Sequence, residues 1–272
     1  MTRIVFVAII CASCLVVCAR ADEWKMAWHD EFDKDGKPNP DNWVFEHGFI
    51  RNEELQYYQP ENATCRGGLL IVEARRERKP NPDYKPDGRG WKNREWIEYT
   101  SACLTTRGKH EFTYGKFEMR ARIDTRSGSW PAFWTLGTSF GRVRWPDCGE
   151  IDIMEYFKGD VLANVCHGQN GRQRWSTTRH PLADLGGDEW SKRFHVWTML
   201  WDERQIELLL DGKRMNIFDV ASADAPGKDN PFRKPQYILL NQAIGGTSGG
   251  DPSKTDFPVR LEVNWVRVYQ RH

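Results

Sequence analysis

The stretch KFEMRARI at residues 116–123 alternates apolar and charged side chains with a period of two. That period is typical of a β-strand with one face in the core and the other in water. Similar patterns occur in LLIVEA at 69–74, in QIELLL at 205–210 and in VRLEVNWVRVYQ at 259–270. No window of helical length carries a sustained apolar stripe at i, i+3, i+4 and i+7. The sequence therefore predicts an all-β chain.

Two local patterns refine this prediction. Asp211-Gly212 follows QIELLL and predicts a type I′ hairpin. In the last stretch the alternate residues from Val259 to Trp265 would share one face, and the phase then changes at Val266. That change indicates a β-bulge or burial on both faces. Without a linker or an internal repeat, we expect one domain, a sandwich of two antiparallel sheets.

Composition limits the classes of function. The 272 residues include 39 Lys and Arg against 38 Asp and Glu, for a formal net charge of +1. Such a balance argues against binding of nucleic acid or of an anionic membrane through bulk charge. Tryptophan is abundant, with 13 residues, and its flat apolar ring with a polar edge suits contact with sugars.

The N-terminus has the features of a secretory signal peptide over residues 1–21. Arg3 is followed by an apolar run at 4–18 and by an Ala-Arg-Ala cleavage signal that ends at Ala21. An uncleaved membrane anchor is the alternative, but the run is short for a membrane span. We expect cleavage near Ala21 and a single soluble, monomeric domain over 22–272, in the periplasm or outside the cell.

Four cysteines remain after this cleavage: Cys65, Cys103, Cys148 and Cys166. None has Cys-x-x-Cys spacing, so a structural zinc site is not expected. An oxidising compartment permits disulfides. Buried free thiols are an equally good alternative, because a chain of this length does not need cross-links.

Three long polar segments interrupt the strand pattern, at residues 75–97, 216–235 and 245–258. Long loops in a compact domain often form the walls of a binding site. The first segment has eight Lys and Arg against three Asp and Glu between Arg75 and Arg94. We interpret it as a solvated basic loop, and a clamp for a sulfated polysaccharide is the alternative.

The stretch GEIDIMEY at residues 149–156 carries three carboxylates in an apolar run. Glu150 and Asp152 are two apart, so on a strand they point to the same face. Glu155 breaks this parity, and one β-bulge before it would return it to that face. Carboxylates crowded there would repel one another, which spreads their proton affinities apart. An acidic exposed face without chemistry is the alternative, and the apolar neighbours argue against it.

These residue types suit the hydrolysis of glycosidic bonds. That reaction uses two carboxylates in different roles across one bond, and the spacing along the strand permits either stereochemical outcome. Trp130 and Trp134 lie just before the acidic strand and Trp145 at its start, where their ring faces could bind sugars. Core packing is the alternative for each of them.

The sequence resembles glycoside hydrolase family 16. GEIDIME, at residues 149–155, looks like the bulged signature of the laminarinase-like members of that family. The flanking matches are WHDEF at 28–32, RNEELQYY at 51–58, YTSACLTTRGKHEFTYGKFEMRARI at 99–123, WPAFWTLG at 130–137, FHVWTMLW at 194–201, NQAIGG at 241–246 and VNWVRVYQ at 263–270. The resemblance implies a β-sandwich jelly roll of two antiparallel sheets with a concave sugar-binding cleft, formed by one catalytic domain.

The same resemblance implies a retaining endo-β-glucanase that acts on β-1,3 or mixed β-1,3/1,4-glucan without a cofactor. Glu150 would be the nucleophile and Glu155 the general acid and then the base. Asp152 would hydrogen-bond the nucleophile and help to keep the acid protonated. The implied substrate-binding residues are Asn52 and Glu53 on the glycone side, Trp130, Trp134 and Trp145 stacked on sugars, and His167 near the acid/base. A purely structural histidine is the alternative for the last.

Two positions depart from the family pattern. Cys103 stands where many members have an arginine, which leaves the hydrogen bonding on the glycone side open. Asn264 stands where many members have an aspartate, at a structural calcium site that would also include Glu31, and the loss of one carboxylate weakens this calcium expectation. The family topology also implies neighbouring strands for Cys65 and Cys103, the first pair we would expect in a disulfide.

Two other functions remain as alternatives. A galactan hydrolase of the agarase or carrageenase kind would share the fold, and the basic loop is its support. A non-catalytic glucan-binding lectin would also share it, but binding members tend to lose the paired glutamates that are present here. Under each alternative the partner is a polysaccharide.

Overall fold

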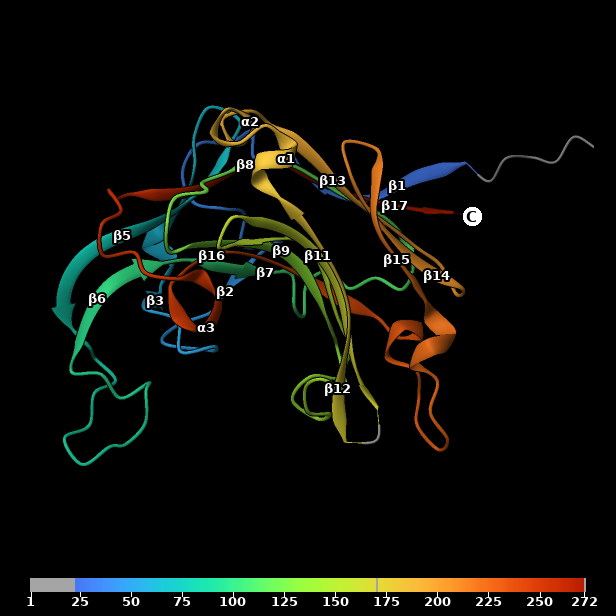
Figure 1. Ribbon diagram of the computed structural model, residues 1–272, viewed down its shortest axis with the longest axis horizontal. Helices are drawn as coiled ribbons and strands as arrows, with labels where there is room; N and C mark the ends of the chain where they lie inside the picture. Colours follow the sequence, from blue (N-terminus) through green and yellow to red (C-terminus); the bar gives the residue numbers. More distant parts are fainter. Residues whose placement is uncertain (1–22, 170, 272) are drawn as a thin grey trace, which may run out of the picture.

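The computed structural model describes residues 23–169 and 171–271, and the predicted signal peptide at 1–21 lies outside this part of the chain. Two β-sheets make up most of it (Figure 1). The strands of the ten-stranded sheet are, in spatial order, β15 (Lys213–Asp219), β14 (Gln205–Leu210), β13 (His195–Trp201), β8 (Gly115–Ile123), β17 (Val259–Arg271), β5 (Leu70–Pro80), β6 (Trp96–Ser101) and β3 (Gln56–Tyr58), with β1 (Trp24–Asp30) beside β17 and β4 (Ala63–Cys65) beside β5. In both sheets the strands pair antiparallel except for the parallel pair of β3 and β6.

The second sheet has seven strands and lines the functional cleft. Its strands are, in spatial order, β12 (Arg172–Pro181), β11 (Asp160–Gln169), β10 (Glu150–Phe157), β9 (Ser129–Gly137), β16 (Gln236–Ile244), β7 (Cys103–Thr105) and β2 (Val44–Phe45). Helical segments are short: α1 (Leu182–Leu185), α2 (Asp188–Ser191), α3 (Gly246–Gly249), η1 (Pro60–Asn62), η2 (Val220–Ala223) and η3 (Pro231–Arg233). Among the described residues, no helix has the length and apolar character needed to cross a membrane.

The core lies between the two sheets. Phe117 and Met119 of β8 and Ile151 of β10 belong to one buried cluster and are 0% exposed. Their charged neighbours on β8 remain partly exposed, so the alternation seen in KFEMRARI is the alternation between core and solvent. The structure therefore confirms the predicted all-β jelly roll of two stacked sheets.

The hairpin and the C-terminal strand test two local predictions. Asp211 and Gly212 have φ of 49° and 76°, as the central residues of a type I′ turn require, so that prediction is confirmed. In β17 the register shifts between Val263 and Trp265, which confirms a bulge. The predicted face of Trp265 is wrong, because the bulge turns its partly exposed ring toward Arg267, at 4.2 Å from the ring centroid.

Much of the first polar segment is strand and not loop. β5 continues to Pro80 and β6 begins at Trp96, which leaves residues 81–95 as the connection. The basic side chains of β5 have partners. Arg76 donates to the backbone oxygens of Pro252 and Ser253, at 2.7 and 2.9 Å. These contacts argue against a free basic clamp.

All four cysteines in the described residues are free and buried. Cys65 lies on β4 of the ten-stranded sheet, and Cys103 lies on β7 of the seven-stranded sheet. The expected pairing of these two is therefore wrong, because their strands are not neighbours.

Candidate active site

A β-bulge in β10 sets the direction of the three carboxylates. Toward β11, Asp152 pairs with Asn164 and Glu155 with Leu162, so two residues face the single Ala163. Those two residues are Ile153 and Met154, both 0% exposed in the core. The predicted bulge is confirmed, and it brings Glu155 to the cleft face with the other two carboxylates.

The cleft has a volume of about 850 Å³ and crosses the seven-stranded sheet. It is lined by Glu46, Ile50, Arg51, Asn52, Trp130, Trp134, Leu136, Phe140, Trp145, Glu150, Asp152, Glu155, Phe157, Leu162, Asn164, Trp175, Thr177, Arg179, Thr247 and Ser248. A smaller recess in its floor is lined by the three carboxylates and also by Glu54 and Asn241. Aromatic side chains together with converging polar groups are typical of ligand sites.

Asn164 links two of the carboxylates. Its Nδ2 donates to Asp152 Oδ2 at 3.1 Å and to Glu155 Oε2 at 2.9 Å. The other oxygen of Glu155, Oε1, accepts from Trp130 Nε1 at 2.7 Å. The sequence analysis missed Asn164, although a lone amide in the apolar strand LANVC was the available signal. Its position allows it to fix the geometry of Asp152 relative to Glu155.

Glu150 has a different environment. Its Oε2 accepts one hydrogen bond, from Trp145 Nε1 at 3.0 Å. Burial raises the pKa of Glu150 to about 7, and repulsion from Glu155 adds to this. Burial also raises the pKa of Glu155 to about 7, against the hydrogen bonds from Trp130 and Asn164.

The pKa of Asp152 is raised well above its ordinary value, first by burial and then by the charges of Glu150 and Glu155. The environment of Asp152 therefore favours its protonated form. Groups that share a site in this way titrate together, so the cluster holds a proton near neutral pH while it still carries a carboxylate. Such a cluster can supply one nucleophile and one proton donor.

The tryptophans fall into two classes. Trp130 and Trp134 are each 7% exposed and lie in the floor of the cleft, where Trp134 Nε1 donates to Asn241 Oδ1 at 2.8 Å. Trp145 is 41% exposed and presents a ring face to the cleft. All three line the cleft. The first two hold Glu155 and Asn241 through their indole N–H groups, whereas Trp145 exposes the most surface of the three for stacking on a sugar.

The turn at residues 51–55 corrects one predicted residue. Asn52 and Glu53 both adopt the left-handed region, with φ of 54° and 52°, which is uncommon for side chains other than glycine. Asn52 lines the cleft, whereas Glu53 is exposed and does not. Glu54 is 3% exposed and reaches the cleft floor instead. Two successive left-handed residues change the direction of the chain, so simple alternation does not apply here.

Arg94 braces this turn from the connection at 81–95. Its guanidinium donates to the backbone oxygens of Glu53 and Leu55, at 3.1 and 3.3 Å, and its Nε donates to Trp91 O at 3.0 Å. It also lies 4.6 Å from the ring centroid of Phe49. The polar segment therefore supports the wall that carries Asn52.

Arg51 is a second cleft residue that the sequence analysis missed. It forms an ion pair with Glu46 and lies 5.2 Å from the ring centroid of Trp134. Burial and then the charge of Glu46 raise the pKa of the Cys103 thiol, which lies beside this pair. A guanidinium therefore reaches the cleft from position 51 and not from position 103.

His167 lies on the other face of β11. It is 4% exposed, and its ring lies 5.7 Å from Phe218 and 6.2 Å from Phe232, between centroids. The residues of β11 that face the cleft are Leu162 and Asn164. The expected contact of His167 with substrate is wrong, and the structural alternative holds.

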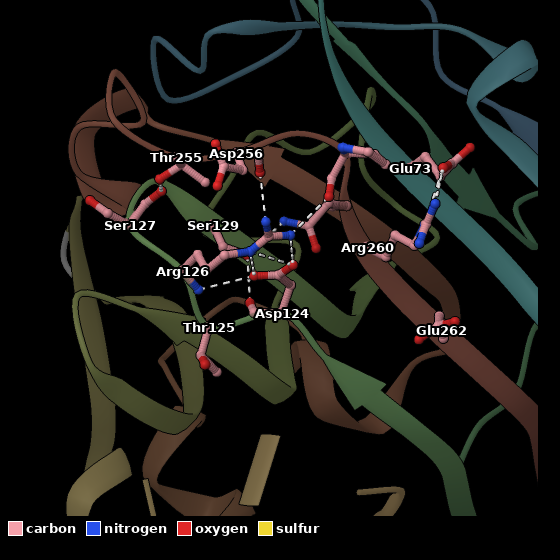
Figure 2. A network of polar contacts seen from close by, with 12 residues as sticks. Glu73, Asp124, Thr125, Arg126, Ser127, Ser129, Thr255, Asp256, Arg260 and Glu262 are labelled. Atoms are coloured by element: carbon pink, nitrogen blue, oxygen red, sulfur yellow. Dashed lines mark hydrogen bonds and ion pairs between the residues drawn. The ribbon is translucent and has the colours of Figure 1, made fainter. Parts of the chain in front are cut away.

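The segment that follows α3 is bound by Arg126, in the connection between β8 and β9 (Figure 2). Arg126 donates to the backbone oxygens of Asp256 and Pro258, at 2.7 and 2.8 Å. Thr247 and Ser248 of α3 line the cleft. The contacts of Arg126 therefore help to fix this second wall.

The residues expected near a structural calcium do not fit that ion. Both carboxylate oxygens of Glu31 accept from Arg267, at 2.8 Å each. Asn264 Oδ1 accepts from Arg120 Nη1 at 2.8 Å. In residues 23–169 and 171–271, no group of three or more His, Cys, Asp or Glu residues could hold a metal ion. Arginine side chains provide the positive charge at both expected ligands.

A cleft across a curved sheet, with aromatic walls and a cluster of buried carboxylates of raised pKa, is the kind of site that glycoside hydrolases use. The model of the glycosyl hydrolases family 16 matches residues 74–267. The chain therefore belongs to that family. It is 38% identical to the beta-glucanase of Rhodothermus marinus over 273 residues, and this alignment covers 92% of this chain and 87% of the relative.

Solved structures agree with this assignment. The endo-1,3-beta-glucanase (laminarinase) catalytic domain of Thermotoga petrophila RKU-1 is similar with a TM-score of 0.78 and 35% identity, over 92% of this chain and 99% of that one. A structure from the endo-acting O-glycanases of the human gut microbiota, which initiate mucin breakdown, is similar with a TM-score of 0.82 and 31% identity, over 91% of each chain.

Proposed function

We propose that the chain is an endo-acting β-glucanase that cleaves β-1,3 or mixed β-1,3/1,4-glucan with retention of configuration. One observation carries the chemistry: the bulge brings Glu150, Asp152 and Glu155 to one face of β10, in a cleft with aromatic walls. The similarity to a beta-glucanase and to a laminarinase supports the choice of glucan.

In the first step Glu150, as the carboxylate, attacks the anomeric carbon. The bond from that carbon to the bridging oxygen breaks, and the oxygen takes the proton of Glu155 as the leaving sugar departs. Trp130 and Asn164 hold both oxygens of Glu155. Glu155 is therefore positioned for proton transfer before the substrate arrives.

In the second step Glu155, now a carboxylate, takes a proton from water while the water oxygen attacks the glycosyl-enzyme. The bond to Glu150 breaks and its carboxylate is released. Burial and the charges of Glu150 and Glu155 raise the pKa of Asp152, which reduces the negative charge that it adds between the two glutamates. The free energy cost of ionising Glu150 is therefore lower than it would be beside a fully charged Asp152.

An endo-acting O-glycanase that acts on mucin is the second candidate. The similarity to a gut-microbial O-glycanase, at a TM-score of 0.82, favours it. The basic loop does not, because Arg94 and Arg76 are bound to backbone oxygens within the protein.

We also propose export after cleavage near Ala21, on the composition of residues 1–21. The mature protein would act as a monomer that is not bound to a membrane. Its partner would be a polysaccharide, and the reaction would proceed without a cofactor. A structural calcium at Glu31 is not proposed.

A substrate panel tests the function. Purified protein is incubated with laminarin, barley glucan, agarose, carrageenan and mucin, and the products are separated by chromatography. We expect oligosaccharides of several lengths from laminarin or barley glucan, with the β-anomer formed first. Cleavage of mucin alone would favour the O-glycanase, and release of the α-anomer first would contradict double displacement. Glu150→Gln, purified in parallel, shows whether any activity belongs to a contaminant.

A further inference from the structure

The residues expected around a calcium ion meet at one joint of the ten-stranded sheet. Glu31 directly follows β1, and the register between β1 and β17 brings it beside the bulge of β17 that contains Asn264. The Nδ2 of Asn264 donates to the backbone oxygen of Gly68 at 3.0 Å, in the turn between β4 and β5. The joint therefore connects β1, β17 and the β4–β5 turn.

Nitrogen donors surround the side-chain oxygens of this joint. Arg267 binds Glu31 through two hydrogen bonds, from Nε to Oε1 and from Nη2 to Oε2, at 2.8 Å each. His29 Nδ1 is a further neighbour of Glu31 Oε1, at 3.1 Å. Asn264 Oδ1 accepts from Arg120 Nη1 at 2.8 Å. The oxygens that would bind a cation therefore accept hydrogen bonds from N–H groups, and a guanidinium supplies the positive charge at Glu31.

Arg267 is held on two sides. Its guanidinium lies 4.2 Å from the ring centroid of Trp265, and its other contact is the carboxylate of Glu31. The side chains of Arg267 and Glu31 are 31% and 25% exposed, so water screens their attraction less than that of a fully exposed pair. The hydrogen bonds from Arg267 lower the pKa of Glu31, which favours the ionised carboxylate. Because Glu31 already has a fixed counter-charge, a metal ion would first have to displace it.

We propose that Arg267 takes the place of a structural cation at this joint, so that the sheet is held there by a charge of the chain itself and without calcium. Asn264 fits this arrangement, because its amide accepts from Arg120 and also donates to Gly68 O, which the carboxylate of an aspartate could not do. Glu31 and Arg267 are not among the residues that line the cleft. The proposal therefore concerns the stability of the fold and does not depend on the proposed function.

Thermal melts with and without calcium test the proposal. The wild-type melting temperature should be the same in millimolar calcium chloride and in EDTA. Arg267→Met keeps an apolar side chain over Trp265 but leaves Glu31 without its counter-charge, so the melting temperature should fall by roughly 3–6 °C. Arg267→Lys returns the charge without the two-pronged geometry and should recover part of that loss. Isothermal titration with calcium measures binding directly, and we expect no binding to the wild-type protein.

The double variant Arg267→Met/Asn264→Asp tests whether the guanidinium stands at the position of a cation. It removes the donor from Glu31 and adds a second carboxylate near Gly68 O, which are ligands that calcium prefers. We expect it to bind calcium in the titration, with a melting temperature that rises in calcium and falls in EDTA.

Arg122→Met is the matched control, because Arg122 also binds a glutamate of β17, Glu262, from β8. This variant should lose stability but gain no response to calcium. Calcium binding by the wild-type protein, or a lower wild-type melting temperature in EDTA, would overturn the proposal. An unchanged melting temperature in Arg267→Met, or a double variant that does not bind calcium, would overturn it as well.

Discussion

Glu150 and Glu155 are the same residue type in one cleft, and their neighbours separate their roles. Glu150 accepts one hydrogen bond, from Trp145, while Glu155 accepts from Trp130 and Asn164. A nucleophile must leave its hydrogen-bond partner and approach carbon, whereas an acid must keep its direction during proton transfer. The looser environment of Glu150 suits the first role.

Removing the nucleophile should stop turnover without loss of fold. Glu150→Gln is expected to lower kcat on the order of 10⁴-fold, since the amide cannot form the glycosyl-enzyme. The same change removes a partly desolvated carboxylate, so the melting temperature at pH 8 should rise. Activity assays and thermal melts measure both effects. Glu98→Gln, at a carboxylate outside the cleft, is the control and should change neither, and near wild-type turnover in Glu150→Gln would refute the assignment.

Arg51 supplies a guanidinium to the cleft wall. Many members of the family have an arginine at the position of Cys103 instead. Arg51→Ala leaves Glu46 without its partner beside Trp134, so we expect kcat/KM to fall by about tenfold. Adding Cys103→Arg to that variant returns a guanidinium to the same wall and should recover part of the loss. A double variant no more active than Arg51→Ala would show that the two positions are not equivalent.

For single residues, the sequence could predict the orientation of side chains on strands that alternate regularly. Glu150 and Asp152 follow from strand parity, and the bulge before Glu155 follows from the break in it. Glu54 was missed because φ above zero at two successive residues cannot be read from RNEELQYY.

Among the elements, β10 depends on its bulge. Deleting Met154 would leave regular alternation and keep Glu155 on the cleft face, but shifted along the strand. A shift of about 1 Å can lower the rate roughly a hundredfold. Met154 is also 0% exposed, so the melting temperature should fall by several degrees. Met154→Leu keeps the bulge and should stay near wild type in both assays. A deletion variant with full activity would show that the bulge is not needed.

The connection at 81–95 should act on binding more than on chemistry. Arg94→Ala removes the bonds to Glu53 and Leu55 that hold the left-handed turn. We expect KM to rise by about tenfold with kcat nearly unchanged, because the turn carries Asn52 and not a reacting group. Arg89→Ala, in the same connection, is the control. A fall in kcat at constant KM would contradict this assignment.

Element boundaries were harder to predict than element types. The basic run from Arg75 to Lys79 has the composition of a loop, yet it forms strand, because Arg76 finds backbone acceptors on a distant loop. Partners that are 176 residues apart leave no local signal. The predicted sheets and the hairpin at Asp211 needed only local pattern, so they were confirmed.

For the whole molecule, stability should depend on pH in a direction set by the cleft. Burial raises the pKa of Glu150 and Glu155 to about 7, whereas the unfolded chain titrates near the ordinary values of about 4. Between these limits the folded state binds more protons than the unfolded state. The free energy of unfolding therefore decreases as pH rises from about 4 through 7.

Glu31 acts in the opposite sense. Its hydrogen bonds to Arg267 hold the pKa below the ordinary value. The stability that it contributes is therefore present above about pH 4.5 and is lost as pH falls further. The two effects together predict greatest stability in the mildly acidic range.

Thermal melts from pH 4 to 8.5 test this prediction. The wild-type melting temperature should decline above about pH 5, and the variant Glu150→Gln/Glu155→Gln should make that decline shallower, because its amides do not titrate while Asp152 with its raised pKa still does. Glu31→Gln, which removes a lowered pKa instead, should keep the decline and lose stability mainly above pH 4.5. Parallel curves for wild type and the double variant would mean that the two cleft carboxylates titrate alike in the folded and unfolded chain. The cleft would then be too well solvated for Glu155 to keep its proton near neutral pH, and its role as the acid would have to be abandoned.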